Sequence, residues 1–150
     1  MTECLELNEV APLISEAVKN GGCFYLSPRG KSMLPTIREG KDTVVLEEFV
    51  SFKKGDILLY RRKNGQFVLH RLVGFKDGKP IMCGDAQFAP EYGISKDDII
   101  ARVSNIIRNK KQINVGSLSF KVYSACLSFR RNTWNALRKF LRPLKHFCRH

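Results

Sequence analysis

Apolar residues near the start of the chain follow a helical pattern. They recur at steps of one, three and four residues: Val10, Leu13, Ile14, Ala17 and Val18. This spacing places them on one face of a helix, and the pair Gly21-Gly22 ends the pattern. Residues 1–22 therefore predict a short amphipathic helix that packs on the core.

Short β-type runs fill the middle of the chain. They cover residues 23–26, 43–46, 57–61, 67–75 and 80–83. The last three are separated by Asn64-Gly65 and Asp77-Gly78, which favour tight hairpin turns because Asn and Gly tolerate a positive φ. These runs predict a β-meander within a mainly β (α+β) fold.

The end of the chain combines a second helical pattern with many basic residues. Its apolar positions are Trp134, Leu137, Leu141, Leu144 and Phe147 or Cys148. Its basic positions include Arg130, Arg131, Arg138, Lys139, Arg142, Lys145 and Arg149. Pro143 should kink or interrupt this helix.

Two interpretations of this basic helix stay open. A basic helix with a Trp/Leu/Phe face is typical of an element that binds an anionic membrane surface. It also fits a terminal helix docked on the core, with its charged face in solvent. Nucleic acid is disfavoured as a partner, because the aromatic residues lie on the apolar stripe rather than among the charges.

The charge distribution divides the chain into three parts. The net charge is +12, yet residues 108–150 hold eleven Lys or Arg and no acid. A length of 150 residues suits one core. We therefore expect an N-terminal helix (residues 1–22), a β domain (residues 23–108) and a basic amphipathic tail (residues 109–150).

The cysteines and the N-terminus indicate the compartment. Five cysteines without CxxC spacing argue against a disulfide framework and a zinc site, and we expect no metal or other cofactor. The N-terminus lacks the basic start and apolar run of a secretory signal. Lys121 and several serines interrupt the run at residues 113–129, which disfavours a membrane span. We expect a cytoplasmic protein, peripheral at a membrane if the tail binds one.

Two residues could form a nucleophile and its base. The segment GKSMLPTI places Ser32 in a turn, and a serine hydroxyl needs a neighbouring base to become a nucleophile. His70, in FVLHRLVGF, is the one histidine outside the tail. Strand alternation places it on the face of Leu72, with Arg71 on the other face. Taken alone, a histidine on an apolar face is more often a core residue than a catalyst.

A carboxylate follows the last strand of the meander. Asp85, in CGDAQ, could reach a residue on the adjacent strand and orient an imidazole. Taken alone, it is more simply explained as a turn residue that hydrogen-bonds its own backbone. Asp56, in KKGDILLY, has the same two interpretations, and there the turn role is favoured.

Three segments, in this order, resemble type I signal peptidases and the related LexA-like peptidases. GKSMLPTI is similar to their serine box. KKGDILLYRRKNGQFVLHRLVG resembles a GD turn followed by the strand that carries the catalytic base just before an arginine. MCGDAQ is similar to the downstream GD box. The resemblance covers about residues 24–108 and implies a signal-peptidase/LexA-like β core.

The resemblance also implies roles for individual residues. Ser32 would be the nucleophile, with its own N–H in the oxyanion hole. Met33 would buttress the site, and Met33 and Pro35 would bind the substrate. His70 stands where most bacterial members have lysine and where the endoplasmic-reticulum and archaeal types have histidine. Asp85 lies in the box where the histidine type keeps its acid. The resemblance thus implies a Ser/His peptidase that cleaves a leader or precursor peptide bound as an extended strand.

Departures from the family pattern keep two other functions open. Gly30 stands where many members keep a serine that assists the oxyanion hole, and such a donor is worth about 3 kcal/mol. The transmembrane anchor usual in the family is not seen. A catalytically weak or inactive binding module with a peptidase fold, docking on a membrane or partner protein, is therefore one alternative. A self-cleaving LexA-like regulator fits poorly, because no Ala-Gly or Cys-Gly precedes Ser32.

Overall fold

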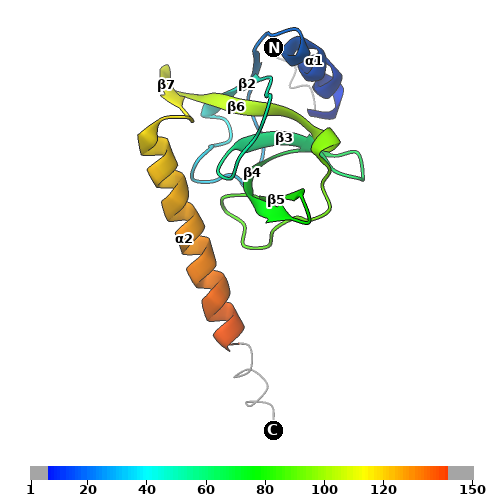
Figure 1. Ribbon diagram of the computed structural model, residues 1–150. Helices are drawn as coiled ribbons and strands as arrows, with labels where there is room; N and C mark the ends of the chain where they lie inside the picture. Colours follow the sequence, from blue (N-terminus) through cyan, green and yellow to red (C-terminus); the bar gives the residue numbers. More distant parts are fainter. Residues whose placement is uncertain (1–6, 142–150) are drawn as a thin grey trace.

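The computed structural model describes the backbone of residues 7–141 and the side chains of residues 12–137. It contains two α-helices, one short 3-10 helix and seven strands: α1 (Leu7–Lys19), β1 (Phe24–Leu26), β2 (Asp42–Glu47), β3 (Ile57–Arg61), β4 (Phe67–Lys76), β5 (Lys79–Cys83), η1 (Lys96–Asp98), β6 (Ile99–Arg108), β7 (Lys111–Asn114) and α2 (Leu118–Leu141). The predicted mainly β (α+β) fold is confirmed (Figure 1).

All strand pairs of the sheet are antiparallel. The strand order is β1-β2-β6-β3-β4-β5, and β7 pairs with β6. Strands β3, β4 and β5 form the predicted meander. Its turns have positive φ at Gly65 (85°), Asp77 (50°) and Gly78 (72°), which explains the choice of these residues.

Strands β6 and β7 were not among the predicted runs. β6 lies in the middle of the sheet, between β2 and β3. Its pairing with these strands shifts register twice, leaving Ile100 and Ser104 without a partner in β3 and β2, respectively. Such bulges break the two-residue alternation that makes a strand visible in a sequence.

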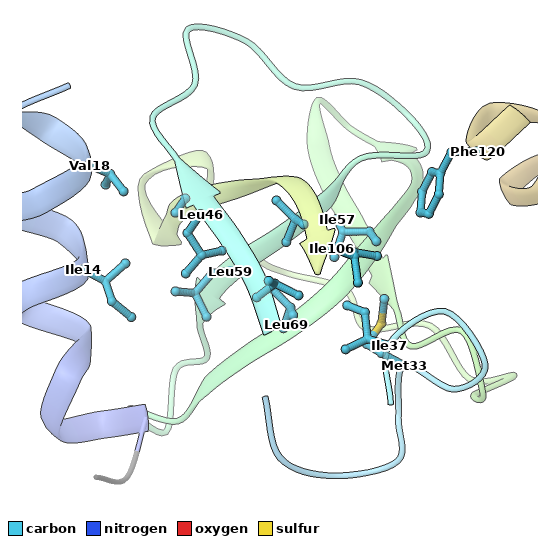
Figure 2. Close-up of a cluster of buried hydrophobic side chains, with 13 residues drawn as sticks. Ile14, Val18, Met33, Ile37, Leu46, Ile57, Leu59, Leu69, Ile106 and Phe120 are labelled. Carbon is cyan, nitrogen blue, oxygen red and sulfur yellow. The ribbon is translucent and has the colours of Figure 1, made fainter. Parts of the chain in front are cut away.

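The core consists of two apolar clusters. One contains Leu58, Leu72 and Met82, together with other residues. Figure 2 shows the other cluster, in which strand side chains lie between Ile14 of α1 and Phe120 of α2.

Helix α1 packs on the sheet as predicted, but over a narrower face. Ile14 and Val18 are buried, whereas Leu13 is 56% exposed. The side chain of Val10 lies outside the described residues. A step of four residues keeps Ile14 and Val18 in line, and Leu13, one position before Ile14, is rotated away by about 100°.

Helix α2 begins earlier than the sequence pattern indicated. It starts at Leu118, and Phe120, Ser124 and Arg131 are buried against the rest of the domain. Pro143 and its neighbours, residues 142–150, lie outside the described residues. Within residues 7–141, no helix is long and apolar enough to cross a bilayer.

Candidate active site

The serine segment is an irregular loop that is anchored by buried apolar side chains. It connects β1 to β2, and the Ile37 N–H donates to the Met33 carbonyl at 2.9 Å. Met33 and Ile37 are both buried in the core cluster of Figure 2. Ser32 is half-buried and Pro35 is exposed. The loop thus keeps Ser32 at the surface by burying the side chain that follows it.

The backbone of Ser32 has two distinct environments. Its carbonyl accepts a hydrogen bond from the Ala86 N–H at 2.9 Å. Its own N–H donates to no other residue in the described part of the chain. This N–H is therefore available to bind a negatively charged oxygen, as an oxyanion hole requires.

Gly84 permits the serine loop to lie against the meander. Arg71 pairs with Cys83 between β4 and β5, so the same register, extended by one residue, sets Gly84 opposite His70. A Cβ atom added at Gly84 would lie only 2.5 Å from the Ser32 carbonyl oxygen. Directly paired residues project to the same face, about 5 Å apart. A side chain at position 84 would lie beside His70. Because Gly84 has none, the Ser32 backbone occupies this space.

His70 is buried among polar partners on its strand face. It is 1% exposed. Its Nδ1 lies 3.2 Å from the Tyr60 hydroxyl oxygen and 3.3 Å from Glu91 Oε1. Among the described residues, these contacts involve Nδ1 alone, and no hydrogen bond joins His70 to the Ser32 hydroxyl.

Glu91 reaches His70 because its backbone extends the sheet. It pairs with Met82 of β5 through two hydrogen bonds, Met82 N–H to the Glu91 carbonyl (3.0 Å) and Glu91 N–H to the Met82 carbonyl (2.6 Å). Arg62 then binds both carboxylate oxygens of Glu91, with 2.8 Å from Nε to Oε2. The acid beside His70 is therefore fixed by both its backbone and its side chain.

The protons available around Nδ1 determine its protonation. Tyr60 has one hydroxyl proton, which it donates to Glu91 Oε2 at 2.8 Å. The Tyr60 oxygen and Glu91 Oε1 can then only accept from His70. We therefore assign the proton of the neutral imidazole to Nδ1. The lone pair of Nε2 is left to accept a proton, as a general base must.

Burial keeps this imidazole neutral. It lowers the pKa of His70 to about 4, although the nearby Glu91 charge acts in the opposite direction. Burial alone would raise the pKa of Glu91, but hydrogen bonds from Arg62 and Tyr60 hold it below its ordinary value. At neutral pH the site thus contains a neutral His70 beside an ionised Glu91.

The Asp85 carboxylate is directed to Arg71 rather than to His70. Arg71 is fully buried and binds both oxygens, Nε to Oδ1 and Nη2 to Oδ2, each at 2.7 Å. Thr36, in the serine loop, donates to Oδ2 at 2.5 Å. Asp85 therefore ties the GD segment to the serine loop and to the residue that follows His70.

Comparison with protein-family models gives a match for this chain. The family model described as Peptidase S24-like matches residues 2–104. The chain belongs to this family. Membership places the S24-like chain in the superfamily of LexA-like and signal peptidase I-like serine peptidases. A search of curated proteins found no match.

Helix α2, which lies beyond the matched segment, completes the surroundings of Asp85 in this S24-like chain. Ser124 accepts a hydrogen bond from Arg71 Nη1 at 2.8 Å. The Tyr123 hydroxyl lies 3.1 Å from that of Thr36. Arg130 donates to the Asp85 carbonyl at 3.2 Å. The site thus depends on a helix that lies outside the matched residues.

The residues proposed for the basic tail occupy different environments. Arg131 is buried, and the Trp134 ring packs 5.5 Å from that of Phe88. The side chains of Arg138 and Lys139, and all of Arg142 and Lys145, lie outside the described residues. Over the part of the tail that the structure describes, up to residue 137, helix α2 is thus docked on the domain.

The sequence prediction omitted Glu91 from the site. The segment 84–95 contains two acids, Asp85 and Glu91, and only the first stands in a recognisable box. The signal in the sequence that could have indicated Glu91 was a second acid in the loop that follows β5.

Within residues 12–137, no group of three or more His, Cys, Asp or Glu side chains is arranged to hold a metal ion.

Proposed function

We propose that the protein is a serine endopeptidase in which Ser32 is the nucleophile, His70 the general base and Glu91 the acid that orients His70. The carrying observation is the buried, neutral His70, with Nδ1 turned to Glu91 and with the Ser32 backbone across Gly84. A histidine needs no desolvation to be neutral near pH 7, unlike a lysine base. The support for this Ser/His arrangement is therefore geometric: Nε2 is unprotonated at neutral pH, although the low pKa of about 4 makes His70 a weaker base than an ordinary imidazole.

The proposed reaction has two steps. The Ser32 hydroxyl attacks the scissile carbonyl carbon while its proton passes to His70 Nε2, and the carbonyl oxygen becomes an oxyanion that the Ser32 N–H stabilises. The C–N bond then breaks, and the proton on Nε2 passes to the departing amine. Water, deprotonated by the same nitrogen, hydrolyses the acyl-enzyme and restores Ser32.

Glu91 and Asp85 have different roles in this proposal. Glu91 stabilises the imidazolium that forms when Nε2 takes the proton, because its charge lies 3.3 Å from Nδ1. Asp85 acts on position, by holding Arg71 and the serine loop. This assigns orientation of the base to Glu91 rather than to Asp85.

Gly30 limits the oxyanion hole. It has a φ of 93°, a conformation that strains residues with a side chain. A serine could not replace it without cost, so the chain lacks the second hydroxyl donor at this position. We infer slow turnover, since one such donor is worth about a hundredfold in rate or more.

We propose a leader or precursor peptide as the substrate, bound as an extended strand beside the serine loop. The S24-like family match supports a peptidase fold, and an extended peptide can pair with an exposed sheet edge such as β1, the edge strand that precedes the serine loop. Small residues next to the cleaved bond are expected from the signal-peptidase resemblance.

Digestion of a peptide library, analysed by mass spectrometry, tests this proposal. We would compare the wild type with Ser32→Ala, His70→Gln and Glu91→Gln, and use Ser51→Ala, at an exposed loop serine, as the matched control. Cleavage should be lost in the first two variants, reduced at least about tenfold in Glu91→Gln, and retained in the control.

Other outcomes separate the alternatives. Equal products from all five proteins would refute the peptidase and leave a binding module. Activity lost in Asp85→Asn but retained in Glu91→Gln would reassign the orienting acid. Thermal unfolding of each variant, followed by circular dichroism, distinguishes loss of chemistry from loss of fold.

A further inference from the structure

Helix α2 has a second apolar face, which is exposed and does not pack on the sheet. We call it the outer stripe, and it consists of Leu118, Val122, Ala125 and Phe129. Leu118 is 77%, Val122 57% and Phe129 71% exposed. Steps of four, three and four residues align these side chains along one helix face.

The outer stripe lies opposite the docked face of the same helix. The docked positions are Phe120, Ser124 and Arg131. At about 100° per residue, the two sets point to opposite sides of α2. Figure 1 shows α2 running along one side of the sheet, with its C-terminal end extending past β5. The outer stripe is therefore not needed to hold the domain together.

A basic groove adjoins the outer stripe. It has a volume of about 1030 Å³ and lies between α2, the turn before β3 and strand β6. Ala125 and Phe129 belong to both the stripe and the groove, and the groove is also lined by Lys53, Lys54 and Lys121. Three ammonium groups thus lie next to an exposed apolar surface.

The acids of this groove already have partners. Glu47 binds Arg102 at 2.8 Å, and the Asp56 carboxylate accepts the Lys53 backbone N–H at 2.9 Å. Helix α2 itself, Leu118–Leu141, contains five Lys or Arg and no acid. The surface therefore carries an excess of positive charge, which complements an anionic partner and repels a second copy of itself.

We propose that the outer stripe and the three groove lysines dock the protein on the surface of an anionic phospholipid bilayer. The stripe enters the boundary between headgroups and acyl chains, and the lysines bind lipid phosphates. This face differs from the one that the sequence pattern favoured, because Trp134 and Arg130 contact the domain.

Co-sedimentation of the full chain with lipid vesicles tests the docking surface. Vesicles of phosphatidylcholine with about a third phosphatidylserine should bind the protein, and vesicles of phosphatidylcholine alone should bind it weakly. The double variant Val122→Glu/Phe129→Glu should bind at least about tenfold more weakly. Leu13→Glu is the matched control, because Leu13 is 56% exposed on a helix elsewhere in the fold and Val122 is 57% exposed.

A second variant tests the charge separately. Replacing Lys53, Lys54 and Lys121 by Gln should also weaken binding about tenfold or more, and added salt should have the same effect. Several results would overturn the proposal: no binding by the wild type, equal binding to neutral vesicles, or unchanged binding by the stripe variant. The last result would assign any binding to residues outside the stripe.

Discussion

The burial of His70 should make the stability of the fold depend on pH in a way that can be calculated. Burial lowers its pKa from 6.5 to about 4. Between these values the unfolded chain binds a proton at this imidazole and the folded chain does not, so the free energy of unfolding falls as the pH falls. The difference corresponds to roughly 3 kcal/mol.

The variant His70→Gln removes this titration while keeping a donor for the Tyr60 oxygen. We would measure urea unfolding of both proteins at about pH 7.5 and about pH 4. The carboxylates with lowered pKa, such as Asp42 and Glu91, weaken both proteins in acid. The wild type should therefore lose about 2–3 kcal/mol more than the variant between the two pH values.

Equal losses in the two proteins would refute the reasoning. Such a result would mean that His70 titrates near its ordinary pKa, and hence that water reaches its ring in solution. The same ionisation should limit activity: an imidazole with a pKa of about 4 stays neutral in weak acid, so cleavage should persist at about pH 5.5, where an ordinary histidine base would be mostly protonated.

Two further substitutions test how the site is assembled. Gly84→Ala should reduce peptidase activity at least about tenfold, because the added Cβ would lie 2.5 Å from the Ser32 carbonyl oxygen. The control Gly74→Ala should cleave peptides normally, because its Cβ would meet only a flexible methyl group at 3.9 Å. Equal activity of the two variants would contradict the close approach of the serine loop to Gly84. Arg71→Met should lower the free energy of unfolding, measured by chemical denaturation, by about 3–5 kcal/mol, because it leaves the buried Asp85 carboxylate without its ion-pair partner. Arg102→Met breaks a partly exposed ion pair and should lower it by less than about 1 kcal/mol. Similar losses in the two variants would contradict the importance of burial.

The parts of the fold with regular local signals could be predicted from the sequence. The meander followed from its turn dipeptides, and the structure confirms that His70 and Arg71 lie on opposite faces of β4, since His70 contacts Tyr60 and Arg71 contacts Phe120. Strand β6 was missed because two bulges interrupt its alternation.

The contacts that complete the site could not be predicted in this way. Glu91 approaches His70 only because its backbone pairs with Met82, and no periodic pattern encodes that pairing. Similarly, the roles of Ser124 and Arg130 depend on which side of α2 faces the sheet. Because α2 is apolar on two sides, residue spacing alone could not decide between them.

The contribution of α2 determines when, during synthesis, the candidate site can be assembled. Ser32, His70 and Glu91 all precede the helix, so a ribosome would have made them before it made Phe120, Tyr123 and Ser124. Until those residues emerge, Arg71 lacks one acceptor and the core lacks the ring that covers it. A nascent chain would therefore carry an incomplete site, and the proposed hydrolysis could begin only after α2 had packed against the sheet.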